Sequence, residues 1–174
     1  MSTGTRPRPS KTVEVVLAGE MRFEATTGSG HLVLVDNLEG DSGPRPTEMV
    51  LIGLATCTAM DVISICRKKR QKIDAYRIHV RAEQRAEYPQ VFTRIDLVHD
   101  LEGARVSEEA VRRSVELSAT KYCPVNAMLS AGATEIHHSY RVTSTGPRGG
   151  VAEAEVIVTG PNQPPDIIDA NESV

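Results

Sequence analysis

The segment from residue 47 to residue 70, "TEMVLIGLATCTAMDVISICRKKR", constrains the fold of this chain more than any other. Pro46 and Glu48 suit the first turn of a helix, and the cations of 67–70 complement the negative end of its dipole, so we expect one helix from Pro46 to about Arg70. A helix on one sheet shows a single apolar stripe, whereas the apolar residues here point all round. Something must therefore cover the second side, and we expect a homodimer with this helix at its centre.

A membrane-spanning helix is the alternative for this segment. Residues 49–66 are about long enough to cross a bilayer, but they contain Asp61, Gly53 and several hydroxyl residues, which disfavour that interpretation. The polar, Pro-rich residues 1–11 lack the apolar core of a secretory signal. We therefore expect the chain in the cytoplasm, with no membrane partner.

Alternating apolar and polar residues predict strands on both sides of the long helix. Before it we expect an antiparallel meander of three strands over residues 12–18, 21–27 and 31–36. After it we expect a hairpin, two helices and a last strand, over residues 74–86, 91–101, 107–122, 124–132 and 134–144. Ser107 suits the N-cap of the first of these helices, because its side chain can accept a hydrogen bond from a free backbone N–H.

The helices in this order do not alternate one for one with the strands. The order predicts an α+β architecture, in which helices pack on one face of antiparallel sheets. We expect residues 1–11 to form a disordered tail and residues 12–144 to form the domain. Residues 145–174 would then be a C-terminal extension, in which 154–159 can add one more strand.

Composition and charge argue against a nucleic-acid partner. Aromatic residues make up 3% of the chain, whereas modules that stack on bases need exposed rings. The formal net charge is −3, so there is no basic field to hold a phosphate backbone.

Three cysteines are the residues with the clearest chemistry. Cys57 and Cys66 lie nine positions apart on one predicted helix, roughly 13 Å along its axis and on opposite faces, so they cannot pair. An intrachain disulfide must therefore use Cys123, with either of the other two. Cys123 precedes a short predicted helix, whose amide groups can stabilise a thiolate.

Two other interpretations of the cysteines compete with redox chemistry. All three can be small buried apolar residues, as cytosolic cysteines usually are. A metal site is the weaker rival, because the spacing is not C-x2-C and because His137 and His138 are strand neighbours that point to opposite faces. We therefore expect no metal and no cofactor.

Several segments resemble the OsmC/Ohr family, that is, osmotically inducible protein C and the organic hydroperoxide resistance proteins. They are "GH" with a following "VDN", "PTEMVLIGLATCTAMDV", "VRAEQRAEYPQVFTRIDLVHDLEG" and "SVELSATKYCPVNAMLS". The resemblance spans about residues 13–143 and is closest to a less characterised branch of the family. It implies an intertwined α+β homodimer with two long helices buried at the centre.

The resemblance also implies a site. Cys57 matches the cysteine that attacks a hydroperoxide, and Cys123 matches the cysteine that resolves the sulfenic acid as a disulfide. Glu48 matches the glutamate near the start of the central helix. Arg22 is the first candidate for the arginine that lowers the pKa of the thiol, and Arg45 is the second. The family implies a dithiol reductant, such as a lipoyl group.

We therefore predict a thiol-dependent peroxidase that reduces organic hydroperoxides in stress defence. The apolar surroundings of Cys57 favour an organic hydroperoxide over hydrogen peroxide. The alternative is a non-catalytic dimer of the same fold that binds a small apolar ligand at the subunit interface. A third hypothesis uses Cys57 as an acyl nucleophile, with His31 as its base, although a strand histidine is more often structural.

Overall fold

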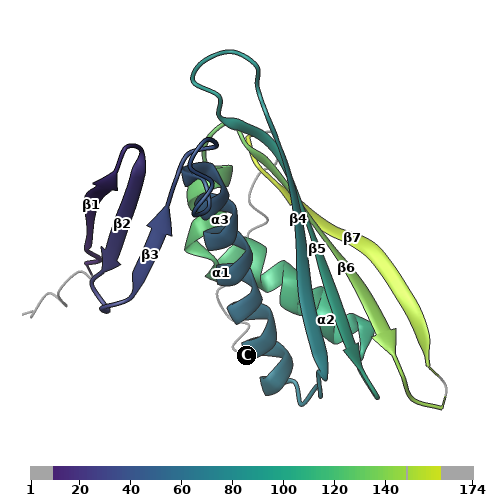
Figure 1. Ribbon diagram of the computed structural model, residues 1–174. Helices are drawn as coiled ribbons and strands as arrows, with labels where there is room; N and C mark the ends of the chain where they lie inside the picture. The colour runs from purple at the N-terminus through teal and green to yellow at the C-terminus, as the bar shows by residue number, and fades with distance from the viewer. Residues whose placement is uncertain (1–9, 148, 162–174) are drawn as a thin grey trace, which may run out of the picture. The chain divides into compact units, whose positions relative to one another are not determined.

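The computed structural model describes residues 10–147 and 149–161, which fall into two compact units divided between Val50 and Leu51 (Figure 1). Each unit is described by itself below. Most of the predicted tail, residues 1–9, lies outside the described residues, as does 162–174 of the predicted C-terminal extension. Ser10 and Lys11 are exposed and belong to no strand.

The first unit contains the predicted meander. Its strands are β1 (Val13–Gly19), β2 (Arg22–Thr27) and β3 (Leu32–Val35), and they pair antiparallel in that order. Glu20, at the turn between β1 and β2, has a left-handed backbone with φ of 37°. The sheet exposes a row of large apolar side chains on β1, namely Val13, Val15, Val16 and Leu17, at 55–61% of their surface. An exposed row of this kind is typical of a surface that another chain covers.

The long helix α1 spans Pro46–Lys68, as the sequence predicted. Its buried side chains form one stripe, at Leu54, Thr58, Val62, Ile65 and Cys66. Ile52 and Met60, on its other side, keep 47% and 71% of their surface exposed. One side of the helix is therefore buried within the second unit, and the other side exposes large apolar residues.

By length and hydropathy alone, α1 is the one helix of the described residues that also meets the criterion for a membrane span. The core helix of a globular domain meets the same criterion. The buried stripe of α1 packs against the apolar clusters of the second unit, whereas Val50, Ile52 and Met60 are exposed.

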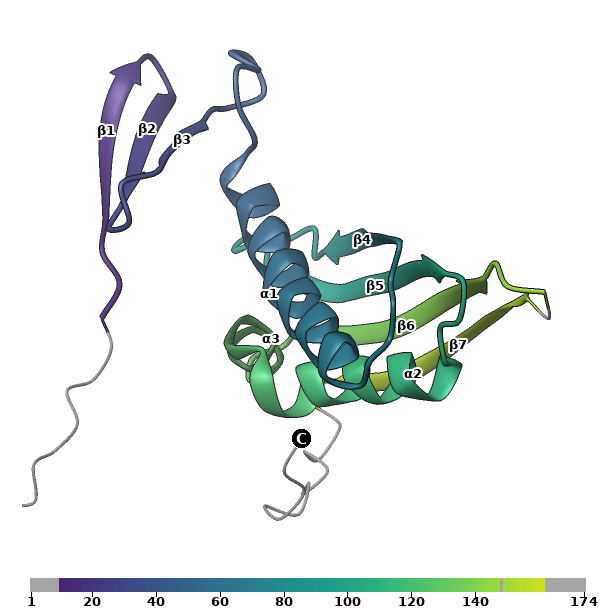
Figure 2. The same cartoon turned by 90° about the horizontal axis from the view of Figure 1, so that it is seen from below.

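The second unit contains a four-stranded sheet in the order β4-β5-β6-β7. The strands are β4 (Ala75–Gln84), β5 (Phe92–Gly103), β6 (Glu135–Ser144) and β7 (Gly150–Thr159). The helices α1, α2 (Glu108–Leu117) and α3 (Pro124–Ser130) lie on one face of this sheet (Figure 2). This arrangement confirms the predicted α+β class. It also shows a strand that begins at Gly150, four residues before the predicted 154–159.

One strand pair differs from the antiparallel sheets that we predicted. β5 and β6 run parallel, from Arg94 opposite Glu135 to Gly103 opposite Ser144. Parallel neighbours need a crossover connection that returns the chain to the end of the sheet where it started. Here α2 and α3 form that crossover, so the two predicted helices determine the direction of β6.

The predicted helix over 107–122 is also not uniform. Ser107 caps α2 as predicted, because its hydroxyl accepts a hydrogen bond from the Ala110 N–H at 3.3 Å. After Leu117 the helix widens into a π-helical turn, η1 (Ser118–Tyr122). π-helical turns of this kind are frequent at functional sites.

Two apolar clusters make the core of the second unit, and α1 contributes to both. One gathers around Val62, Val111 and Leu101, and the other around Leu54, Ile95 and Ile136. The inward-facing residues of β5 occur at every second position, as the predicted alternation requires.

A buried polar chain runs through the same core. The Oη of Tyr76 lies 2.7 Å from Nδ1 of His99, and the rings of His99 and His138 stack at 6.0 Å between centroids. Nε2 of His138 lies 2.9 Å from Oδ1 of Asn126. Both imidazoles are fully buried, and burial lowers the pKa of His99 to about 3 and that of His138 to about 4, so both are neutral at pH 7.

We predict that these two histidines make the fold sensitive to acid. Each pKa is lower in the folded chain than the ordinary 6.5, so the unfolded chain binds the proton more tightly. The stability that each contributes is complete above pH 6.5 and is lost as the pH falls toward the folded pKa. At pH 5 the loss is about 2 kcal/mol of unfolding free energy for each histidine.

Urea unfolding at pH 8 and pH 5 measures this loss. A His138→Gln variant should lose about 2 kcal/mol less than the wild type between the two pH values. His79→Gln is the matched control, since it replaces an exposed histidine of β4 in the same way. Equal acid losses in the wild type and in His138→Gln would contradict the prediction.

Candidate functional site

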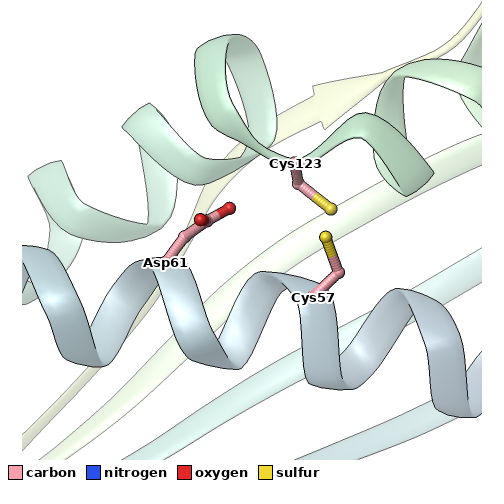
Figure 3. A group of neighbouring side chains, drawn as sticks. All are labelled: Cys57, Asp61 and Cys123. Carbon is pink, nitrogen blue, oxygen red and sulfur yellow. The ribbon is translucent and has the colours of Figure 1, made fainter. Parts of the chain in front are cut away.

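The structure brings Cys57 and Cys123 together, although 66 positions separate them in the chain. Their sulfur atoms lie within 4.8 Å of each other and point toward one another (Figure 3). Both are free thiols. Cys66 lies elsewhere, fully buried in the first apolar cluster, where its thiol donates to the Ser114 hydroxyl at 3.5 Å.

The crossover positions the second of these sulfurs. Cys123 is the N-cap of α3, with extended backbone angles, and Pro124 follows as the first helical residue. Its Sγ accepts a hydrogen bond from the Asn126 N–H at 3.3 Å and lies 3.6 Å from the hydroxyl of Thr58 on α1. Asn126 also ends the buried histidine chain described above. The thiol of Cys123 is therefore held from both sides.

Asp61 is a third member of the cluster that the sequence analysis missed. A carboxylate oxygen of Asp61 lies within 4.8 Å of both sulfurs (Figure 3). The Ser118 hydroxyl, in the π-helical turn, donates to Asp61 Oδ2 at 3.0 Å. The sequence spacing could have predicted this position, because Asp61 follows Cys57 by four residues and residues four apart on a helix are neighbours.

The electrostatics of the cluster keep Cys57 protonated. Burial raises the pKa of the Cys57 thiol to about 11, with a contribution from the hydrogen bond to Cys123 and a smaller one from the charge of Asp61. The backbone N–H of Val125 acts in the opposite direction. Burial also raises the pKa of Asp61, against the hydrogen bond from Ser118. No cation is among these causes, and a cation or further hydrogen-bond donors beside Cys57 would favour its thiolate.

The other predicted site residues belong to the first unit. Arg22, at the start of β2, donates to the backbone oxygen of Ala18 at 3.2 Å. Glu48, in the first turn of α1, accepts a hydrogen bond from the Arg45 N–H at 2.8 Å. His31 precedes β3, and its Nδ1 lies 3.3 Å from the Ser29 hydroxyl. Their parts in the chemistry of Cys57 stay predictions.

The arrangement allows two kinds of chemistry. Two adjacent thiols can be oxidised to a disulfide, provided that the sulfurs approach to bonding distance. Two thiols and a carboxylate are also suitable ligands for a metal ion. Within residues 10–147 and 149–161, Cys57, Asp61 and Cys123 are the group whose donor atoms converge in this way.

The chain is similar in sequence to members of one family. The family of OsmC-like proteins matches residues 39–147. Protein YhfA from Escherichia coli K12 is 41% identical over 124 residues, which make up 71% of this chain and 92% of YhfA.

Solved structures have the same fold. A hypothetical protein from Aquifex aeolicus VF5 superposes with a TM-score of 0.70 at 28% identity, over 79% of this chain and 98% of that chain. An organic hydroperoxide resistance protein from Elizabethkingia anophelis superposes with a TM-score of 0.57 at 14% identity, over 81% of this chain and 100% of that chain. These findings confirm the resemblance that the sequence predicted. The chain belongs to the OsmC-like protein family.

Proposed function

We propose that this protein is a thiol-dependent peroxidase that reduces organic hydroperoxides, with Cys57 as the attacking and Cys123 as the resolving residue. The observation that carries the proposal is the convergence of two free sulfurs, from α1 and from the N-cap of α3, within 4.8 Å. Such a pair is what a sulfenic acid needs for resolution as a disulfide.

The reaction follows from the chemistry of the two sulfurs. The Cys57 thiolate attacks one peroxide oxygen, the O–O bond breaks, and the leaving alkoxide takes a proton to become an alcohol. Cys57 is then a sulfenic acid. The sulfur of Cys123 attacks it, the S–S bond forms, and water leaves. A dithiol reductant, which we expect to be of the lipoyl type, restores both thiols and is itself oxidised to a disulfide.

Family relationships support this proposal. Proteins of the same fold include organic hydroperoxide resistance proteins, such as that of Elizabethkingia anophelis. They support a role in the defence against oxidative stress. Those structures are only distantly related in sequence. The mechanism is therefore inferred from the residues of this chain.

The side chains around the sulfurs favour an organic substrate. Cys123 belongs to the second apolar cluster, against which Cys57 also packs. Leu51, Val125 and Leu129 pack against the same cluster. An alkyl group gains free energy from contact with such side chains, about 0.8 kcal/mol for each buried CH2, whereas hydrogen peroxide has no group to bury.

The mechanism needs Cys57 as a thiolate, and the cluster contains no positive charge that favours it. We propose that Arg22 provides the positive charge and that Glu48 orients its guanidinium. We also propose that the active form is a cytoplasmic homodimer, since α1 and β1 both expose large apolar side chains in the single chain.

The alternative is a non-catalytic dimer that binds a small apolar ligand. A shallow hollow of about 240 Å³ between α1 and β4 favours it, lined by Ala55, Thr56, Ala59, Tyr76, Arg77 and Ile78. The hollow lies in the second unit and contains no cysteine. Its occupation would therefore leave the thiols unchanged, which separates the two proposals experimentally.

Titration of free thiols before and after one equivalent of cumene hydroperoxide tests the peroxidase. We expect the reduced protein to lose two of its three thiols, because Cys57 and Cys123 form a disulfide. Cys57→Ser should abolish the loss. Cys66→Ser is the matched control, since Cys66 lies outside the cluster, and it should still lose two thiols. An unchanged thiol count in the wild type would reject the peroxidase and favour the ligand-binding dimer.

The identity of the activating arginine is a separate prediction. Arg22→Ala should slow the thiol loss at pH 7 by about tenfold or more, because each unit of pKa changes the thiolate fraction about tenfold. Arg22→Lys should recover part of the rate, since it keeps the charge. Stopped-flow measurement of thiol loss gives the rates, with Arg45→Ala as the comparison. If thiol loss is slow in Arg45→Ala but not in Arg22→Ala, Arg45 is the activating residue and the assignment of Arg22 is wrong.

A further inference from the structure

We propose that Cys57, Asp61 and Cys123 also form a binding site for a thiophilic divalent cation such as Zn²⁺. The inference goes beyond the peroxidase, which needs the two sulfurs but not the carboxylate. It rests on the position of Asp61, whose carboxylate converges with both thiols (Figure 3). The spacing of 57, 61 and 123 matches no zinc motif, so the sequence alone does not predict the site.

The distances suit a tetrahedral ion after a small contraction. All three donor atoms lie within 4.8 Å of one another. Zinc binds sulfur at about 2.3 Å and carboxylate oxygen at about 2.0–2.2 Å, which places tetrahedral ligands roughly 3.5–3.8 Å apart. Cys57 and Asp61 lie one turn apart on the same helix, so their side chains need only rotamer adjustments to close on an ion.

Hydrogen bonds outside the cluster already orient its donor atoms. Ser118 donates to the Asp61 carboxylate at 3.0 Å, and Asn126 donates its N–H to the Cys123 sulfur at 3.3 Å. The N–H of Val125 interacts with the sulfur of Cys57. Metal ligands in proteins are commonly held by such outer hydrogen bonds, which fix their direction before the metal arrives.

The charges also favour a cation. With both thiols deprotonated and Asp61 ionised, the ligands carry three negative charges. A bound divalent ion reduces the net charge of the site to −1. The amide donors of Val125 and Asn126 offset part of that remaining charge. Binding releases the two thiol protons to solvent, so affinity rises with pH.

The site leaves room for exchange. Cys57 and Asp61 are partly exposed, whereas Cys123 is buried. Three protein ligands leave one position of a tetrahedral ion open to water, unlike the closed sites with four protein ligands that hold structural zinc. We therefore infer a reversible site. A bound ion withdraws electron density from both sulfurs and holds them at the metal, so it should slow their attack on a peroxide and their pairing as a disulfide.

Cobalt is a suitable probe, since Co²⁺ takes the same geometry and its thiolate complexes absorb in the near ultraviolet and the visible. We expect the reduced, untagged full chain to bind one Co²⁺ per chain with a tetrahedral spectrum, which Zn²⁺ abolishes by displacement. Cys57→Ser and Cys123→Ser should each remove the two-thiolate spectrum. Asp61→Asn should weaken binding by about tenfold or more, because it removes a charged ligand. Cys66→Ser is the matched control and should bind as the wild type does.

Oxidised wild-type protein provides a second measurement that needs no substitution. Treatment with diamide should abolish Co²⁺ binding, and reduction should restore it. The proposal would be overturned if the wild type bound no Co²⁺ or gave an octahedral spectrum. It would also be overturned if Cys66→Ser lost binding while Cys57→Ser kept it. Binding within a factor of two of the wild type in Asp61→Asn would overturn the assigned ligand set.

The metal site and the peroxidase can fail separately. Binding is measured without peroxide, and peroxide-dependent thiol loss is measured after removal of metals with a chelator. Thiol loss without Co²⁺ binding rejects the metal site alone. Co²⁺ binding without thiol loss rejects the peroxidase alone. If both hold, one equivalent of Zn²⁺ should protect the two thiols from cumene hydroperoxide.

Discussion

The packing of α1 on the sheet of the second unit is the interaction on which the site depends. Leu54, Thr58, Val62 and Ile65 form the buried stripe, and their burial fixes the rotation of the helix about its axis. Cys57 and Asp61 lie beside this stripe, and that rotation turns them toward the crossover (Figure 3). The parallel direction of β5 and β6 requires the crossover, which brings Cys123 to them. Core packing and strand direction together therefore assemble three reactive side chains.

The same packing decides how reactive the cluster is. Burial raises the pKa of the Cys57 thiol and that of the Asp61 carboxyl, and an ionised Asp61 opposes a thiolate beside it. In the proposed functions, a positive charge beside Cys57 would favour its thiolate. An arginine and a metal ion are two ways to provide that charge, with opposite consequences. An arginine would leave the sulfur uncoordinated, whereas a bound metal would lower its nucleophilicity.

Each of the two units exposes an apolar surface of its own. The side of α1 that carries Ile52 and Met60 faces no part of its own sheet, and β1 exposes consecutive large apolar residues. Exposed apolar area of this extent costs free energy in water, at about 25 cal/mol for each Å². The proposed homodimer would cover such surfaces, as the all-round apolar character of the long helix led us to expect.

The sequence by itself determined the elements. The strands β1 to β6, the ends of α1, the cap of α2 and the α+β class follow from local composition, periodicity and end signals, which depend on near neighbours only. The motifs around Cys57 and Cys123 also identified the family. Only the tertiary structure decided that β6 runs parallel to β5, that His99 and His138 are buried and neutral, and that Asp61 joins the two sulfurs. These three features depend on which distant segments come into contact and on how far water is excluded between them. Local periodicity contains no information about either.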